Sequence, residues 1–138
     1  MNIEWRGVKE TAQNLVKRGE RVRVVEQDAM LEAVLYVHSQ MPGYPPALPN
    51  SRYQRTGKLG QSVTALSGKA EGALSRVEML GGNAVGVIGT AIGYAPLVIG
   101  EGTQKAIHKG RWWTLQKVVE DAREKIIKIF ERRIGKEL

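Results

Sequence analysis

The sequence contains no cysteine among its 138 residues. Disulfides, thiolate metal sites and cysteine nucleophiles are therefore excluded. No window approaches the ~20 uninterrupted apolar residues that a membrane-spanning helix needs. The first residues, Met-Asn-Ile-Glu-Trp-Arg, lack the cationic segment followed by an apolar run that marks a signal peptide. We therefore expect a protein that is made and assembled in the cytosol and has no membrane partner.

Patterns typical of catalysis and cofactor binding are also missing. The two histidines, His38 and His108, are far apart, and neither lies in an H-x-x-x-H or H-E-x-x-H spacing. No serine lies in a G-x-S-x-G motif, and the glycines do not match the dinucleotide fingerprint. The Gly-Lys pair at 57–58 lacks the flanking residues of a phosphate-binding loop. We therefore expect no enzyme activity, no metal and no cofactor.

Aromatic residues make up only 6% of the chain, which is too few for a base-stacking surface. Charge, in contrast, is unbalanced, because 21 Lys and Arg face 14 Asp and Glu and give a formal net charge of +7. A positive charge favours polyanions without specificity, and it also keeps a protein soluble. Arg52, Arg55 and Lys58 form a local basic cluster. They are our candidates to face DNA in a channel or another polyanion, with a solvated surface as the alternative.

Apolar residues spaced mostly three or four apart predict one long helix over residues 8–40. The stripe consists of Trp5, Val8, Ala12, Leu15, Val22, Val25, Ala29, Ala33 and Val37. Such a helix would measure about 50 Å and would project beyond the core of a domain this small, where it would suit an oligomer contact. Val24, Leu31 and Leu35 lie off the stripe. They indicate either burial against a neighbouring subunit or a wide core-facing surface.

Prolines concentrate in residues 41–55, which predicts a stiff, extended surface loop. Thr56 is placed to cap a short helical turn through Ser62. Residues 62–92 then show the periodicity of strands. The signs are the alternation of Ser75, Val77 and Met79, the turn Gly81-Gly82-Asn83, the return at Val85 and Val87, and an earlier apolar segment at Val63, Ala65 and Leu66. They predict an antiparallel meander of about three strands, with Gly86 and Gly89 at a close backbone approach or bulge.

A second amphipathic helix is expected over residues 113–134. Its apolar stripe consists of Leu115, Val118, Val119, Ala122, Ile126, Ile129, Phe130 and Ile134. The chain length fits one domain. The order helix, strands, helix predicts an α+β fold, with the long N-terminal helix and the C-terminal helix packed on one face of the small meander.

Residues 93–113 connect the sheet to this helix and are rich in glycine and aromatic side chains. Such a segment docks onto its own sheet or contacts a partner. Trp112 and Trp113 are adjacent and cannot both face inward on a regular element. We expect one to cap the core and the other to be exposed or at an interface, with burial of both left open. Our candidates for subunit or partner contacts are Tyr94, Pro96, Leu97, Glu101, Thr103, Trp112 and Trp113.

The succession of three short motifs resembles a family of proteins from long-tailed bacteriophages. The motifs are Arg55-Thr56-Gly57-Lys58-Leu59 with Ser62, then Tyr94-Ala95-Pro96, then Glu101-Gly102-Thr103. In order, they are similar to those of the neck or tail-completion family, also described as head–tail joining or minor tail proteins. Two features depart from the family pattern. Glu101 directly precedes Gly102, and Lys109-Gly110-Arg111-Trp112-Trp113 replaces a Pro- and Phe-rich entry to the last helix.

This resemblance implies a structural, non-enzymatic virion protein, assembled in the host cytoplasm. Such proteins form homo-oligomeric rings in the neck or at the head-proximal end of the tail. Their partners are head-closure or connector proteins and the tail tube or terminator, around the channel for genomic DNA. A closed ring uses heterologous contacts, for which the first helix and the connector are plausible opposite faces. A tail-terminator ring that caps the tail tube is one alternative, and a small basic nucleic-acid-binding protein is the alternative from another class.

Overall fold

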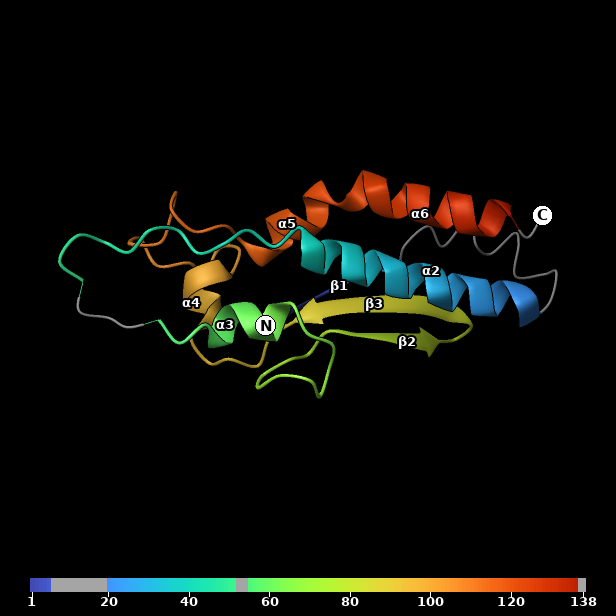
Figure 1. Ribbon diagram of the computed structural model, residues 1–138, viewed down its shortest axis with the longest axis horizontal. Helices are drawn as coiled ribbons and strands as arrows, with labels where there is room; N and C mark the ends of the chain where they lie inside the picture. The colour runs from blue at the N-terminus through green and yellow to red at the C-terminus, as the bar shows by residue number, and fades with distance from the viewer. Residues whose placement is uncertain (6–19, 52–54, 137–138) are drawn as a thin grey trace.

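The computed structural model describes residues 1–5, 20–51 and 55–136 of the chain. The elements are β1 (Asn2–Trp5), α2 (Glu20–Ser39), α3 (Lys58–Val63), β2 (Arg76–Leu80), β3 (Asn83–Gly89), α4 (Ala95–Ile99), α5 (Leu115–Asp121) and α6 (Arg123–Gly135). Helices and an antiparallel sheet in one elongated molecule confirm the predicted α+β class (Figure 1).

The sheet has three antiparallel strands in the order β1-β3-β2, so its third strand comes from the N-terminus. Trp5, which the sequence pattern placed on the first helix, pairs instead with Gly86 at the end of β1. The pairing is tight at Gly89, where a Cβ atom would overlap Asn2 and the Met1 carbonyl. A glycine is therefore required for this approach, as the sequence pattern predicted. Most of the first half of the expected long helix falls in residues 6–19, which lie outside the described residues.

The β2–β3 hairpin turns at the predicted glycine pair. Leu80 pairs with Asn83, so the loop between them has two residues, Gly81 and Gly82. Their φ angles are 59° and 82°, and positive values at both central positions define a type I′ turn. This turn matches the right-handed twist of the strands, and residues with a Cβ adopt it at a steric cost.

The segment before β2 differs from the expected strand. Val63 ends α3 and is fully buried there, and Leu66 forms only an isolated bridge to Ser75. A hydroxyl pair holds α3 against the end of the sheet. Ser62 donates to the Leu59 carbonyl at 2.7 Å, so the Thr90 hydroxyl, 2.6 Å away, donates to Ser62. The predicted helical turn thus exists, but its N-cap is Gly57 (φ 78°) rather than Thr56.

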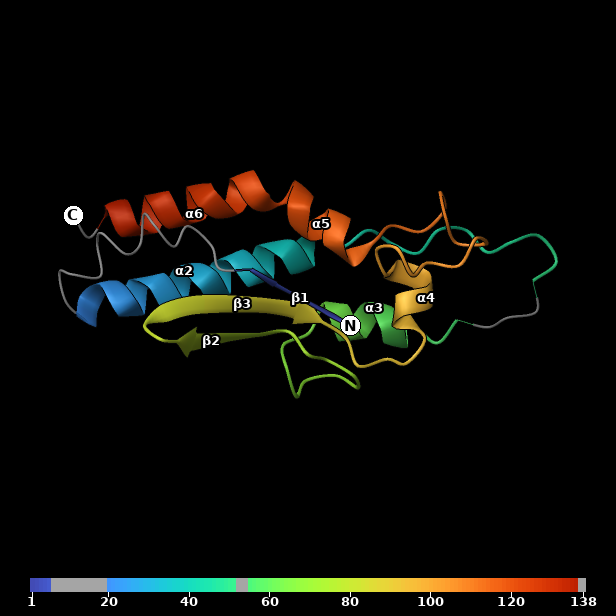
Figure 2. The ribbon, with the colours of Figure 1, turned by 180° about the vertical axis from the view of Figure 1, so that it is seen from behind.

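Helix α2 lies between the sheet and α6 (Figures 1 and 2). The predicted stripe positions Val22, Ala29, Ala33 and Val37 are buried. The buried carboxylate of Glu26 joins α2 to the sheet, because its Oε1 accepts the Ala84 N–H at 2.8 Å. Packing is therefore layered: α2 covers the sheet and α6 covers α2, whereas the sequence pattern placed both helices on one face of the sheet. Helix α2 packs against both layers because its buried residues face the sheet on one side and α6 on the other.

The C-terminal helical region is divided in two. Helix α5 begins at Leu115, after Trp113, because the Thr114 hydroxyl caps it by accepting the Lys117 N–H at 3.3 Å. The helix then breaks at Ala122, whose N–H is shared between the Val118 and Val119 carbonyls. Because of this break, α5 contacts β1, whereas α6 packs along α2. All predicted stripe residues from Leu115 to Ile134 are nevertheless buried.

Two arginines of α6 hold it to α2 at the surface. Arg132 and Arg133 each donate to one oxygen of Glu32. Burial alone would raise the pKa of Glu32, but hydrogen bonds and charges from the two guanidiniums outweigh it and hold the pKa below its usual value. Beneath this clamp, the side chains of Ile126, Ile129 and Phe130 join the core.

We expect His38 to make the stability of this fold depend on pH. It is buried in the last turn of α2, and its Nε2 has no hydrogen-bond partner among the described residues. Burial lowers the pKa of His38 below its ordinary value of 6.5. Because the unfolded chain then takes up a proton at a higher pH than the folded chain, the free energy of unfolding should fall as pH drops through about 6.5.

Urea denaturation at about pH 7.5 and about pH 5.5 tests this expectation. The His38→Gln variant should lose less stability between the two pH values than the unmodified protein. An equal loss in both proteins would assign the pH dependence to other groups.

Candidate functional site

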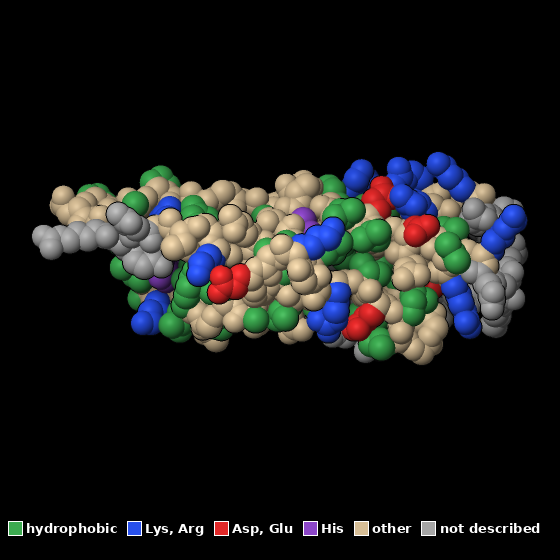
Figure 3. Space-filling model, turned by 60° about the horizontal axis from the view of Figure 1, so that its bottom comes forward, with side chains coloured by type: hydrophobic (Ala, Val, Ile, Leu, Met, Phe, Trp, Pro, Cys, Tyr) green, Lys and Arg blue, Asp and Glu red, His purple; other side chains and the backbone are tan. Residues whose placement is uncertain are grey.

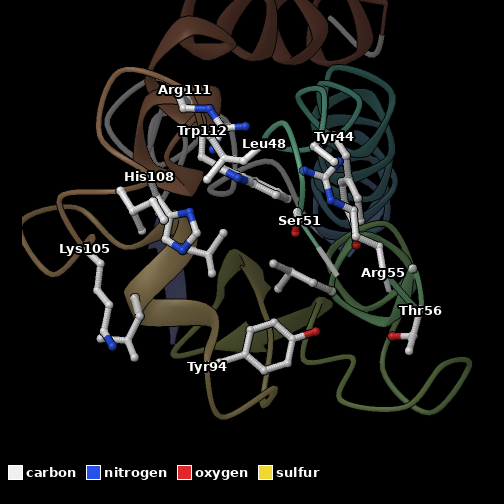
Figure 4. Close-up of a pocket in the computed structure, with 16 residues that line it drawn as sticks. Tyr44, Leu48, Ser51, Arg55, Thr56, Tyr94, Lys105, His108, Arg111 and Trp112 are labelled. Atoms are coloured by element: carbon white, nitrogen blue, oxygen red, sulfur yellow. The ribbon is translucent and has the colours of Figure 1, made fainter. Parts of the chain in front are cut away.

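The main candidate site is a pocket of about 460 Å³. The proline-rich loop and α3 form one wall, and α4 with the connector forms the other (Figure 4). Its lining residues belong to α3, α4 and the segments beside them, which lie at the end of the molecule opposite the start of α2 (Figure 1). Its volume falls within the about 300–1,000 Å³ typical of ligand pockets.

Trp112 is the centre of an aromatic cluster at this pocket. Its ring centroid lies 5.0 Å from that of Tyr44, 6.1 Å from His108 and 6.3 Å from Trp113. Both tryptophans are half-buried and pack against the core, so neither is the fully exposed residue that the sequence allowed for. Trp112 forms part of the pocket wall, whereas the indole N–H of Trp113 is buried without a hydrogen-bond partner in the described chain.

Two arginines attach the proline-rich loop to the connector. The Arg55 guanidinium lies 5.5 Å from the Tyr44 ring centroid and 5.4 Å from that of Trp112, and it donates to the Pro45 carbonyl. Arg111 donates to the Pro46 carbonyl at 2.5 Å. The Tyr44 hydroxyl accepts the Gly60 N–H at 2.7 Å, which ties the loop to α3. Contacts between segments distant in sequence therefore shape the pocket.

The connector is held by its own side chains. Gln104 donates to the carbonyls of Val98, at 2.7 Å, and Trp112, at 3.1 Å. Two of the predicted contact residues also have intramolecular partners: Thr103 donates to the Pro96 carbonyl at 2.5 Å, and Glu101 accepts from the Thr114 hydroxyl at 3.0 Å. Both remain exposed, but their hydrogen bonds give them a structural role in the connector.

Four large apolar side chains are exposed around the pocket, and we call them the pocket rim. They are Leu48 (40% exposed), Tyr94 (41%), Leu97 (40%) and Ile107 (54%). The sequence pattern had singled out Tyr94 and Leu97, with Pro96 half-buried beside them. It did not identify Leu48 and Ile107. Each is a single apolar residue within a turn-forming segment, and the sequence gives no other indication of its role. The rim brings together residues from the loop, α4 and the connector.

The pocket is positively charged. Lys105, Arg55 and Arg111 line it, and none of its described lining residues is Asp or Glu. Burial lowers the pKa of His108, and the charges of Arg111 and Lys105 lower it further, so His108 is neutral near pH 7. The predicted basic cluster is divided: Arg55 reaches the pocket, Lys58 forms an ion pair with Glu71 at 3.2 Å, and Arg52 lies outside the described residues.

Two further surfaces stand out among the described residues. Val24, Leu31 and Leu35 form an exposed apolar strip along α2, with exposed fractions of 59%, 38% and 49%. We call them the α2 strip; they are not part of the core. The second surface is the α6 basic stripe of exposed Lys125, Lys128, Arg132 and Lys136, which recur at steps of three and four. Figure 3 shows Lys and Arg side chains gathered at the end of the molecule away from the pocket.

Comparison with models of known protein families, with curated protein sequences and with solved structures finds no match for this chain. No group of three His, Asp or Glu in the described ranges is placed to hold a metal ion. None of the described helices is both long and apolar enough to cross a membrane.

Proposed function

We propose that this protein is a structural ring subunit of the neck, or of the head-proximal end of the tail, of a tailed bacteriophage or prophage. The observation that carries the proposal is the presence of two separate exposed apolar surfaces, the pocket rim and the α2 strip, on one small domain. Exposed apolar patches mark interaction sites. Two different patches suit a ring subunit that contacts more than one kind of neighbour, with the α2 strip against another copy in the ring and the pocket rim against an adjoining structural protein.

The places of the motif residues support this proposal. Leu59 and Ser62 of the first motif are buried in α3, where Ser62 is hydrogen-bonded to Thr90, and Ala95 of the second motif is the buried first residue of α4. Tyr94 and Leu97 of the same segment lie on the pocket rim. The positions of these motif residues therefore support a contact role for this surface. The neck is our first choice of position, and a tail-terminator ring would use the same surfaces.

Electron microscopy and light scattering at rising protein concentration test the proposal directly. Closed rings, or a ring position located in virions by labelling, are the expected result. A protein that stays monomeric under every condition and binds duplex DNA tightly at physiological salt would contradict it.

The α2 strip offers a sharper prediction. Leu35→Asp places a charge at the C-terminal end of the strip, where burial against a neighbour would cost its desolvation. We expect self-association to weaken at least about tenfold, while stability of the monomer changes by less than about 0.5 kcal/mol. Gln27→Asp, at an exposed polar position of the same helix, is the matched control. Equal association of the two variants would remove the α2 strip from the ring contact.

One observation favours a second candidate, a basic nucleic-acid-binding protein. The α6 basic stripe presents four cations on one exposed face, and the ion pair of Arg132 with Glu32 leaves the net charge there positive. Binding of a DNA duplex measured over a range of salt concentrations separates the candidates. A steep salt dependence that is lost when Lys125 and Lys128 become Glu, in a protein that forms no rings, would support the second candidate.

A further inference from the structure

The three cations of the pocket have no carboxylate partner among the described residues. Arg55 and Arg111 donate to backbone carbonyls of the proline-rich loop, and Lys105 is exposed and forms no ion pair with the described residues. A carbonyl neutralises no charge, and each guanidinium carries five N–H donors, so both arginines keep donors to spare. Three positive charges thus line one hollow, and their mutual repulsion would be relieved by an anionic ligand.

The walls between these cations are apolar. Leu59, Val98 and Trp112 line the pocket, and the pocket rim continues this apolar surface outward. Figure 4 shows Arg55, Arg111 and Lys105 placed around the hollow, with Trp112, His108 and Tyr94 between them. A ligand that satisfies both features must carry negative charge and apolar groups side by side.

We propose that the pocket is the docking site for an extended peptide segment of an acidic partner protein. The segment would carry Asp or Glu beside an apolar or aromatic side chain. The apolar side chain fills the hollow, the carboxylates meet Lys105 and the two arginines, and the flanking residues cover the pocket rim. Bidentate pairing of a carboxylate with a guanidinium provides the directional part of this recognition. The inference rests on the proposed function in one respect, because the partner would be a neighbouring structural protein.

Other occupants fit less well. A second copy of this chain carries the same excess of seven positive charges, which disfavours its approach to a cationic hollow. A DNA duplex would satisfy the cations but would leave the apolar rim exposed to water. A small metabolite would also leave most of the rim uncovered.

A fluorescein-labelled peptide, Asp-Glu-Phe-Leu-Glu-Asp, tests the inference by fluorescence anisotropy with the full chain. We expect a dissociation constant below about 1 mM. Asp-Glu-Gly-Ser-Glu-Asp has the same charge without apolar side chains, and Lys-Lys-Phe-Leu-Lys-Lys has the apolar side chains with the opposite charge. Both should bind at least about tenfold more weakly, because the pocket requires both features. An unlabelled DNA duplex should not displace the first peptide at equal phosphate and carboxylate concentrations.

Two pairs of variants locate the binding. Lys105→Glu should weaken the first peptide at least about tenfold, whereas Lys69→Glu, at an exposed position outside the pocket lining, should not. Leu97→Ser should also weaken it, whereas Leu80→Ser should not. Leu80 is the matched control because its exposed fraction of 43% is close to the 40% of Leu97. Circular dichroism melts confirm that each variant is folded.

Several results would overturn the inference: no peptide binding, equal binding of the Gly-Ser peptide, equal loss in the control variants, or displacement by DNA. The proposed function has a separate readout. Rings that form while no acidic peptide binds would contradict the inference alone. Peptide binding at the pocket by a protein that never assembles would contradict the ring and leave the pocket assignment in place.

Discussion

Replacing Phe130 by alanine is expected to lower the free energy of unfolding by about 3–5 kcal/mol. Phe130 is the largest fully buried side chain of the described core, with 1% exposed, and it lies on the face of α6 that packs on α2. Its truncation removes apolar burial and leaves a cavity between two helices that cannot fully close. Because the α6–α2 contact is one of the two interfaces of α2, the loss should reach the whole fold.

Urea denaturation followed by circular dichroism measures this effect. Glu131→Ala, at the neighbouring exposed position, should change the free energy of unfolding by less than about 0.5 kcal/mol. A loss below about 1 kcal/mol for Phe130→Ala would mean that α6 contributes little to the stability of the layered core.

The second large effect is expected at Gly100, which follows α4 within the connector. A Cβ atom here would overlap the Pro96 carbonyl and the Thr103 hydroxyl and would lie 2.9 Å from the Pro96 Cα. The backbone dihedrals, φ −83° and ψ 132°, are ordinary for any residue, so the barrier to substitution is steric. Gly100→Ala should therefore force α4 away from the turn that contains Thr103 and cost about 2–3 kcal/mol.

A matched control lies seven residues earlier in the same segment. A Cβ atom at Gly93 would meet no atom within 4 Å, and its φ is not positive. Gly93→Ala should be neutral or stabilise by up to about 1 kcal/mol, because it restricts the unfolded chain. Thermal unfolding of both variants, followed by tryptophan fluorescence, measures the difference. Similar melting of Gly100→Ala and Gly93→Ala would show that the contact of Gly100 with α4 is dispensable.

The Gly100 substitution also links stability to the pocket. Val98 and Leu97 of α4 line one side of the hollow, and the Thr103–Pro96 hydrogen bond closes the turn that positions them. A displaced α4 would widen the pocket and separate Leu97 from Lys105. A loss of peptide binding in Gly100→Ala at temperatures where the variant is folded would therefore report the geometry of the pocket itself.

Local sequence patterns predicted the helices and the turn that depend mainly on residues close together in the chain. The apolar stripes identified the core faces of α2, α5 and α6, and two glycines with positive φ marked the β2–β3 turn. Predictions of features that depend on residues far apart in the chain were wrong or missing. Strand β1 has only four residues, too few for periodicity to distinguish a strand from the start of a helix. It forms a strand because Met1 and Asn2 pair with Thr90 and Gly89.

For the candidate site, the sequence indicated the connector but not the pocket. Glycine, aromatic residues and the motif containing Tyr94 singled out residues 93–113, and Tyr94 and Leu97 do lie on the pocket rim. The cations that give the pocket its charge come from positions 55, 105 and 111, whose separation in sequence gave no reason to group them. Lys58, which the local cluster included, is neutralised by Glu71 instead.

The sequence by itself determined the α+β class, the two amphipathic helices, the tight turn, and the absence of cysteine chemistry, because each depends on residue type or on spacing within one element. Only the tertiary structure decided that α2 is sandwiched between sheet and α6, that the α2 strip remains exposed, and that a cationic, apolar pocket exists. These depend on which distant segments meet. Packing between such segments is set by the shape and volume of whole surfaces, which a one-dimensional pattern does not record.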